Sequence, residues 1–208
     1  MIEAILTVLA FAAAEPQNAD PKGDPARWVR ARDLPAISAD AAVTTFDLTI
    51  DEKGKPVGCA IIVSSGQNDL DQAVCSAVSK RARFTPASDG NGLNVYSVRR
   101  DRVIWMPNAR GDNASYDAAD LVVTSPELQS NAKILINVLL LISNSGDTSQ
   151  CMIAKSSGTL KLDELACEAA TNPQIALPIT DKAGEMVAGI RSLFVTFERG
   201  PTTNVRIR

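Results

Sequence analysis

Residues 54–86 read GKPVGCAIIVSSGQNDLDQAVCSAVSKRARFTP, and residues 146–178 read GDTSQCMIAKSSGTLKLDELACEAATNPQIALP. A shift of 92 residues aligns the two segments without a gap. Both keep a glycine, two cysteines, an SSG triplet and a Leu-Asp pair in register. Such self-similarity is typical of an internal duplication, so we expect two domains. The shared landmarks are Gly54 and Gly146, Cys59 and Cys151, Ser64-Ser65-Gly66 and Ser156-Ser157-Gly158, Leu70-Asp71 and Leu162-Asp163, and Cys75 and Cys167.

The first copy alternates between strand and helix patterns. Residues 44–50 alternate apolar and polar side chains, which predicts a half-buried strand, and residues 57–63 predict a second strand after a turn. Beyond the SSG triplet, Asn68 or Asp69 can cap a helix whose apolar stripe spans 70–78. Residues 95–105 predict a third strand. The second copy repeats this plan at 133–142, 150–155, 162–170 and 187–198, so the expected fold is α+β, with two tandem ββαβ domains that are each a small antiparallel sheet covered by a helix.

The four cysteines indicate one disulfide in each copy. Both pairs are separated by 16 residues, so the repeat favours Cys59–Cys75 and Cys151–Cys167 over the other pairings. The first cysteine of a pair lies on a strand before the SSG turn, and the second lies at a similar depth on the returning helix. A redox-active or metal-binding pair is the alternative, but the spacing is not CxxC and the chain has no histidine.

Composition excludes several function classes. With no histidine, His-based acid–base catalysis and most zinc chemistry are absent, so we expect no enzyme, no metal and no cofactor. The net charge of −3 and an aromatic content of 4% argue against a nucleic-acid partner. Ser64 next to Ser65 could suggest a nucleophile, but the triplet occurs twice at a strand-to-helix turn, which favours a structural role.

The N-terminus predicts export. Residues 5–14 form a short apolar run that ends in Ala12-Ala13-Ala14, which is typical of a cleaved signal peptide although no Lys or Arg precedes it. An uncleaved tether or a mis-assigned start is the alternative. The expected organisation is a signal peptide at 1–14, a first domain at 15–106, a linker at 107–124 and a degenerate second domain at 125–208.

Residues 26–106 resemble the C-terminal domain of the TonB family. The resemblance rests on the hairpin glycine, the SSG triplet, the Leu-Asp helix start, RARFTPA at 81–87 and Arg27-Trp28 upstream. The cysteine pair is similar to a disulfide-bearing branch of that family. The second copy matches more weakly, because Pro173, Ile175 and Ala176 stand at the positions of Arg81, Arg83 and Phe84.

The resemblance implies a periplasmic binding module whose partner is an outer-membrane receptor or another envelope protein or peptide. It implies binding by strand addition, in which an extended peptide pairs with an edge strand of the sheet. Unlike an energy-transducing TonB, the sequence offers no inner-membrane helix and no Pro-rich spacer, so only the binding function carries over. The alternative is a structural or regulatory envelope protein that self-associates through its sheet edges, for example as a homodimer.

We expect the third strand of the first copy to be the free edge. Three arginines lie on it, and they either protect the edge from aggregation or dock an acidic peptide. Arg81 and Arg83 are expected to complement the helix C-terminus, and Trp28, Phe84 and Trp105 to pack in the core or at its rim. The candidate partner-binding residues are Val95, Ser97, Arg99, Arg100 and Arg102.

Overall fold

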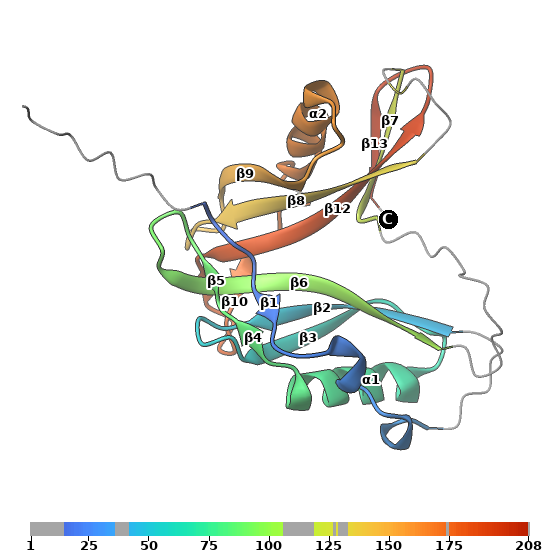
Figure 1. Cartoon of the computed structure of the whole chain (residues 1–208), viewed down its shortest axis with the longest axis vertical. Helices are drawn as coiled ribbons and strands as arrows, with labels where there is room; N and C mark the ends of the chain where they lie inside the picture. Colours follow the sequence, from blue (N-terminus) through green and yellow to red (C-terminus); the bar gives the residue numbers. More distant parts are fainter. Residues whose placement is uncertain are drawn as a thin grey trace, which may run out of the picture.

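The computed structural model describes residues 15–35, 42–105, 119–126, 128, 133–173 and 175–207. Over these residues the chain is α+β, with two α-helices, one nine-stranded mixed sheet and two small two-stranded sheets (Figure 1). The predicted signal peptide, 1–14, and most of the predicted linker lie outside the described residues. Neither described helix is long and apolar enough to cross a membrane.

The first run of elements follows the order that the sequence predicts. Its long strands pair antiparallel in the order β3–β2–β6, and its helix α1 packs on β2 and β3. Two short strands, not predicted, lie between the helix and the last strand. The elements are β2 (Ala42–Ile50), β3 (Pro56–Val63), α1 (Asn68–Arg81), β4 (Phe84–Thr85), β5 (Ala87–Ser88) and β6 (Asn94–Trp105).

The second run repeats this order. Its long strands pair antiparallel as β9–β8–β12, with α2 packed on β8 and β9. The two helices therefore lie on opposite outer sides, and the strands lie between them (Figure 1). The elements are β8 (Ile134–Ile142), β9 (Thr148–Lys155), α2 (Leu160–Ala170), β10 (Ile179–Thr180), β11 (Met186–Val187) and β12 (Gly189–Arg199).

The two runs share one sheet, whereas the sequence predicted two small separate sheets. β6 and β12 pair in parallel over Tyr96–Val98 and Gly189–Arg191. Gly189 permits this approach, because a Cβ atom there would lie 2.4 Å from the carbonyl oxygen of Tyr96. Joining the two sheets satisfies peptide groups that would otherwise line two open edges.

Three further strands were not predicted. β1 (Asp20–Pro21) pairs with β4, and β7 (Leu121–Ser125) pairs in parallel with the C-terminal half of β12. β13 (Asn204–Ile207) then pairs antiparallel with β7. The predicted linker, 107–124, therefore ends in a strand, because the Leu-Val-Val run at 121–123 is buried against β12. Residues 106–118 lie outside the described residues.

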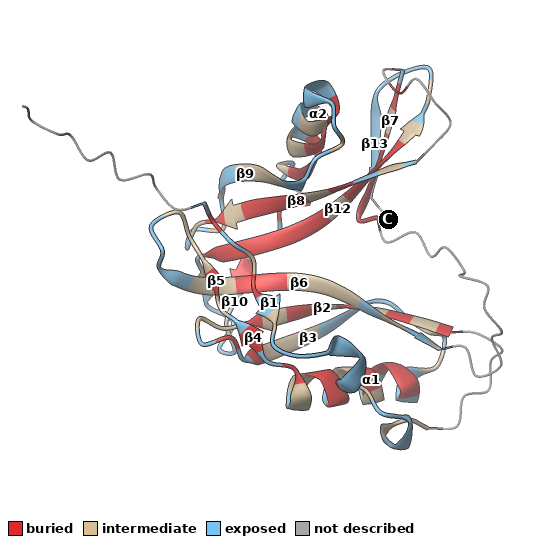
Figure 2. Cartoon of the chain, viewed as in Figure 1, coloured by how far each residue is buried: buried red, intermediate tan, exposed pale blue. Residues whose placement is uncertain are grey.

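The buried residues form two cores, each built mainly from one run (Figure 2). Leu139 and Ile190 of the second run join the first core, and Val98 of β6 joins the second. In α1 the predicted stripe is buried at Leu70, Val74, Ala77 and Val78. Trp28 is 6% exposed and packs on Phe84, with ring centroids 5.3 Å apart. The side chain of Trp105 lies outside the described residues.

Both predicted disulfides are confirmed. Cys59 on β3 is bonded to Cys75 on α1, and Cys151 on β9 is bonded to Cys167 on α2. The Cα–Cα distances are 5.7 Å and 5.8 Å. Each bond ties an outer strand of the sheet to the helix of the same run.

The SSG triplets are helix-start motifs built around a later aspartate. Ser64 Oγ donates to Asp71 Oδ2 (2.6 Å) and the Ser65 amide donates to Asp71 Oδ1 (3.0 Å). Neither Asn68 nor Asp69 caps the helix as predicted; Gln67 is the N-cap and makes no side-chain cap bond. The second run repeats both bonds from Ser156 and Ser157 to Asp163, at 2.6 Å and 2.9 Å.

These bonds set the charge state of both aspartates. Burial raises the pKa of Asp71, but donors from Ser64, Ser65 and Thr44 favour the carboxylate and together lower the pKa below its ordinary value. In Asp163 burial again raises the pKa, and Ser156 and Ser157 lower it overall. Both carboxylates are therefore charged acceptors at neutral pH.

The two arginines after α1 have different roles. Arg83 Nη1 donates to the carbonyl oxygens of Ala82 (2.6 Å) and Lys80 (3.2 Å), as expected for a cation at a helix C-terminus. Arg81 instead donates to the Trp28 carbonyl oxygen (2.7 Å) and pairs with Asp33. Arg81 thereby fixes the N-terminal segment on the first run.

Candidate functional site

Strand β6 has one fully paired edge and one partly open edge. On one side it pairs with β2 from Ser97 to Trp105. On the other side it pairs with β12 only at Tyr96–Val98, and no other described strand pairs with residues 99–105. The expectation of a free edge is therefore wrong for Tyr96–Val98. It stays a prediction for residues 99–105, which we call the β6 edge.

The five predicted partner-binding residues divide accordingly. Val95 pairs with Ala87 of β5, and Ser97 is completely buried at the junction with β12. Both are internal contacts of the fold. Arg99, Arg100 and Arg102 lie on the β6 edge, but their side chains have different surroundings.

Arg100 belongs to a buried ionic cluster at the junction of the two runs. It binds both carboxylate oxygens of Asp47, with Nε–Oδ1 at 2.7 Å and Nη2–Oδ2 at 3.0 Å, and it also pairs with Asp120. On β12, Arg191 lies 3.6 Å from Asp47 and donates to the carbonyl oxygens of Leu177 and Pro178. The two runs therefore meet here through Asp47 and Arg191, and Arg100 is a member of this cluster, which its sequence neighbours could not reveal.

Burial dominates the electrostatics of Arg191. It lowers the pKa of this guanidinium, the carboxylate of Asp47 opposes that effect, and the positive charge of Arg100 adds to it. The hydrogen bonds to two carbonyl oxygens satisfy the donors that burial removes from water. Since an arginine stays charged in proteins, the cluster holds two cations between two carboxylates.

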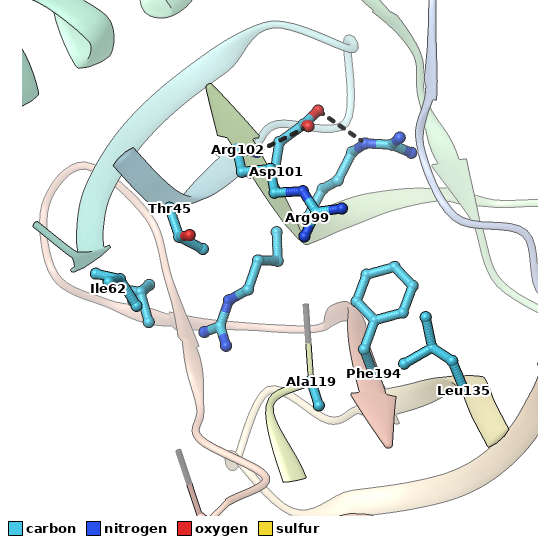
Figure 3. A pocket seen from close by; sticks show the side chains of 10 residues that line it. Thr45, Ile62, Arg99, Asp101, Arg102, Ala119, Leu135 and Phe194 are labelled. Atoms are coloured by element: carbon cyan, nitrogen blue, oxygen red, sulfur yellow. Dashed lines mark hydrogen bonds and ion pairs between the residues drawn. The ribbon is translucent and has the colours of Figure 1, made fainter. Parts of the chain in front are cut away.

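Asp101 organises the rest of the β6 edge. Its Oδ1 accepts the backbone N–H of Arg102 (3.0 Å), and its Oδ2 lies 3.7 Å from Arg99 Nε (Figure 3). Arg99 also donates to the carbonyl oxygen of Ala19 (3.4 Å). A side chain that binds an amide of its own strand competes with any incoming strand for that amide. Asp101 therefore occupies one backbone donor of the edge, and sequence reasoning did not identify it.

A cavity of about 430 Å³ opens on one face of the β6 edge, and we call it the inter-run hollow. Its apolar wall includes Ile62, which is 40% exposed, and Leu135, which is 39% exposed. Residues from both runs face one another across it (Figure 3). It is lined by Thr45, Ile62, Val63, Arg99, Arg100, Asp101, Arg102, Ala119, Leu135 and Phe194.

A second cavity of about 440 Å³ lies on the opposite face of the same edge, and we call it the tryptophan hollow. Phe46 lines this hollow and Thr45 lines the other, and successive residues of a strand point to opposite faces. Asp101 and Arg102 border both cavities. The tryptophan hollow is lined by Pro25, Ala26, Trp28, Val29, Phe46, Val78, Asp101, Arg102, Val103 and Ile104.

This arrangement suits the binding of an extended chain. A strand that pairs with the β6 edge directs its side chains alternately to the two faces of the sheet, and each face here has a hollow. In the described part of the chain, no group of three or more His, Cys, Asp or Glu residues is placed to hold a metal ion. Ser64, the residue that could suggest a nucleophile, donates to Asp71 within its turn.

The fold and the site thus define an α+β protein with a partly open sheet edge between two apolar hollows. Residues 39–100 match the family described as Gram-negative bacterial TonB protein C-terminal. The match covers β2, β3, α1 and the first half of β6, and it supports the TonB C-terminal resemblance for this part of the chain. No curated protein and no solved structure matches the chain.

Proposed function

We propose that this chain is a periplasmic binding protein related to the TonB C-terminal family, in which the β6 edge takes up an extended segment of an outer-membrane receptor or another envelope protein. The observation that carries this proposal is the stretch 99–105, which pairs with β2 on one side and with no other described strand, and which has a hollow on each face. Unpaired backbone groups at a sheet edge bind a strand through main-chain hydrogen bonds, and pockets beside the edge select its side chains.

The proposal includes the organisation of the chain. Residues 1–14 act as a cleaved signal peptide, and residues 15–106 and 125–208 are tandem copies of one domain. The matching order of elements and the repeated disulfides support the duplication. Strand addition needs no catalytic group, so the protein acts by binding and not as an enzyme.

The experiment is selection of short peptides from a random display library against the full disulfide-bonded chain, followed by hydrogen exchange on the complexes. We expect selected peptides to protect the amides of residues 99–105, and Arg102→Glu to weaken their binding by reversing a charge between the hollows. Arg206→Glu is the matched control, because Arg206 is another exposed strand arginine, on β13 and paired with Glu198. Peptides that protect other residues, and bind Arg102→Glu unchanged, would rule out the β6 edge as the site.

Self-association through a sheet edge is the second candidate function, and β3 favours it. This strand is the last in its half of the sheet and carries no charged residue. Ile61, Ile62 and Val63 are 37%, 40% and 53% exposed. Uncharged apolar edge strands tend to pair with other chains. Light scattering at increasing concentration tests this function, which predicts a dimer that dissociates when Ile61→Lys introduces a charge on β3.

A further inference from the structure

The end of α1 and the N-terminal segment together form a basic surface on the first run (Figure 1). The backbone N–H of Lys22 donates to the carbonyl oxygen of Arg83 (2.7 Å), and Arg81 Nε donates to the carbonyl oxygen of Trp28 (2.7 Å), so the segment lies against the helix end. The cations here outnumber the carboxylates, although the net charge of the whole chain is −3. The cations, which we call the basic patch, are Lys22, Arg27, Arg30, Arg32, Lys80, Arg81 and Arg83, and the carboxylates are Glu15, Asp20, Asp24 and Asp33.

Most cations of the basic patch have no carboxylate beside them. Arg81 pairs with Asp33, and Arg27 lies 3.7 Å from Asp24 with 85% of its side chain exposed, which is a weak pair in water. The turn between β2 and β3, which contacts β4, has two acidic and two basic residues and adds no net charge. In the part of the chain that the structure describes, five exposed cations take part in no ion pair: Lys22, Arg30, Arg32, Lys80 and Arg83.

The second run builds the same helix without these charges. The last turn of α2 contains no basic residue, yet α2 still packs on β8 and β9 and keeps its disulfide. A basic helix end is therefore no requirement of this arrangement of strands and helix, and the fold by itself does not account for the excess charge. At the positions of Lys80, Arg81 and Arg83 the second run has Asn172, Pro173 and Ile175.

We propose that the basic patch binds an anionic phospholipid surface and so attaches the first run peripherally to a membrane. This inference goes beyond the proposed function, because none of the five exposed cations lines the inter-run hollow or the tryptophan hollow. Each lysine or arginine close to an anionic membrane strengthens binding roughly fivefold. The acidic residues elsewhere on the chain do not cancel this attraction, since charges more than about 10 Å apart are largely screened at 0.1 M salt.

The layout of the basic patch favours a surface over a single ion or a nucleic acid. Its cations come from separate elements, with Lys22 next to β1, Arg32 in the 3₁₀ turn Ala31–Asp33 and Lys80 in the last turn of α1. The neighbouring aromatic side chain, Trp28, is 6% exposed and offers no platform on which a base could stack. An anionic bilayer presents many phosphates over a broad area and requires neither a pocket nor such a platform.

The test is co-sedimentation of the full disulfide-bonded chain with vesicles of about 30% phosphatidylglycerol in phosphatidylcholine, and with pure phosphatidylcholine vesicles as the reference. At about 0.1 M NaCl we expect wild-type protein to bind the anionic vesicles and not the neutral ones. At about 1 M NaCl it should be released, because the Debye length falls from about 10 Å to about 3 Å. Lys22→Gln/Arg32→Gln/Lys80→Gln should lower the partition coefficient at least tenfold, and because these side chains make no hydrogen bond or ion pair in the described structure, its circular dichroism should match wild type.

The control is Lys155→Gln/Lys161→Gln/Lys182→Gln, which removes the same charge from exposed lysines of the second run. It should keep the partition coefficient within about twofold of wild type. Failure of wild-type protein to bind the anionic vesicles, or an equal loss in both triple variants, would overturn the proposal. Inorganic phosphate and a short DNA duplex, each added at constant ionic strength, should leave the protein on the vesicles; release by either would mean that the basic patch takes a soluble phosphate or a nucleic acid and not a lipid surface.

Discussion

Gly189→Ala tests whether the two runs depend on their close approach at the junction. A Cβ atom at this position would lie 2.4 Å from the Tyr96 carbonyl oxygen and 2.9 Å from Ile179 Cδ1. The carbonyl is part of the β6 backbone, which pairs with β12 at Tyr96 and with both β2 and β12 at the next two residues, so it cannot rotate away as a flexible side chain could. The two strands must instead separate by roughly 1 Å to restore van der Waals contact.

The expected cost follows from this overlap. Inserting a methyl group into well-packed structure typically costs about 1–3 kcal/mol, and because the clash is with backbone we expect the upper half of that range. For a chain of this size such a loss lowers the melting temperature by roughly 5–10 °C. Hydrogen exchange at Tyr96–Val98 should accelerate, because those amides lose their neighbouring strand.

The assay is thermal unfolding followed by circular dichroism, with both disulfides intact, together with hydrogen exchange of the native protein. Gly184→Ala is the control, since Gly184 has a φ of 84° and a Cβ atom added there would meet no other atom within 4 Å. It should cost about 1 kcal/mol through backbone strain alone and leave Tyr96–Val98 protected. A loss below about 0.5 kcal/mol in Gly189→Ala, with unchanged exchange at Tyr96–Val98, would refute the parallel pairing of β6 and β12.

Three further predictions concern the disulfides, the helix-start aspartates and the β6 edge. Replacing Cys59 and Cys75 by alanine should lower the free energy of unfolding by about 3 kcal/mol in urea titration. Replacing Cys151 and Cys167 should lower it by about the same amount, because both bonds span 16 residues. A more than twofold difference between the two losses would mean that strain or packing, and not loop closure, dominates. Because the pKa of Asp71 is lowered in the folded state, its carboxylate stabilises the fold fully above the ordinary pKa of 3.8, and this stabilisation is lost as the pH falls through the native pKa. Asp71→Asn should therefore be less stable than wild type at pH 7 and should lose less stability on acidification. Parallel curves of stability against pH for the two proteins would contradict this. Asp101→Ala should bind the library-selected peptides several-fold more tightly by anisotropy, since it removes an acceptor of the Arg102 amide and a negative charge from the edge, and unchanged or weaker binding would show that Asp101 does not compete with the peptides for this amide.

Much of the local structure could be predicted because its signals lie within short windows. The alternation at residues 44–50 appears as β2, and the apolar stripe at 70–78 appears within α1. β7 had a comparable signal in Leu121-Val122-Val123, but the polar residues before it led to its assignment to the linker. The helix start was predicted in the right place with the wrong cap, because Asp71 reaches back to a serine seven residues earlier.

The candidate site was only partly predictable. The sequence pointed to the third strand and to its arginines, and Arg99, Arg100 and Arg102 do line the inter-run hollow. It could not show that Arg100 is bound by Asp47 and Asp120, since Asp47 lies on β2, Asp120 directly precedes β7, and neither belongs to a motif. Leu135 and Phe194 are ordinary strand residues in the sequence, and only their position opposite β6 relates them to the site.

The sequence by itself indicated a repeat and determined the cysteine pairing and the order of the long strands and the helix in each run. These features depend on the periodicity of neighbouring residues and on a repeat, both of which are visible along one chain. The tertiary structure alone decided that the runs share one sheet, which part of β6 pairs with no described strand besides β2, and which side chains surround it. Those outcomes depend on the approach of backbone segments about 90 residues apart, such as Gly189 against Tyr96, and the energy of such an approach has no local signature in the sequence.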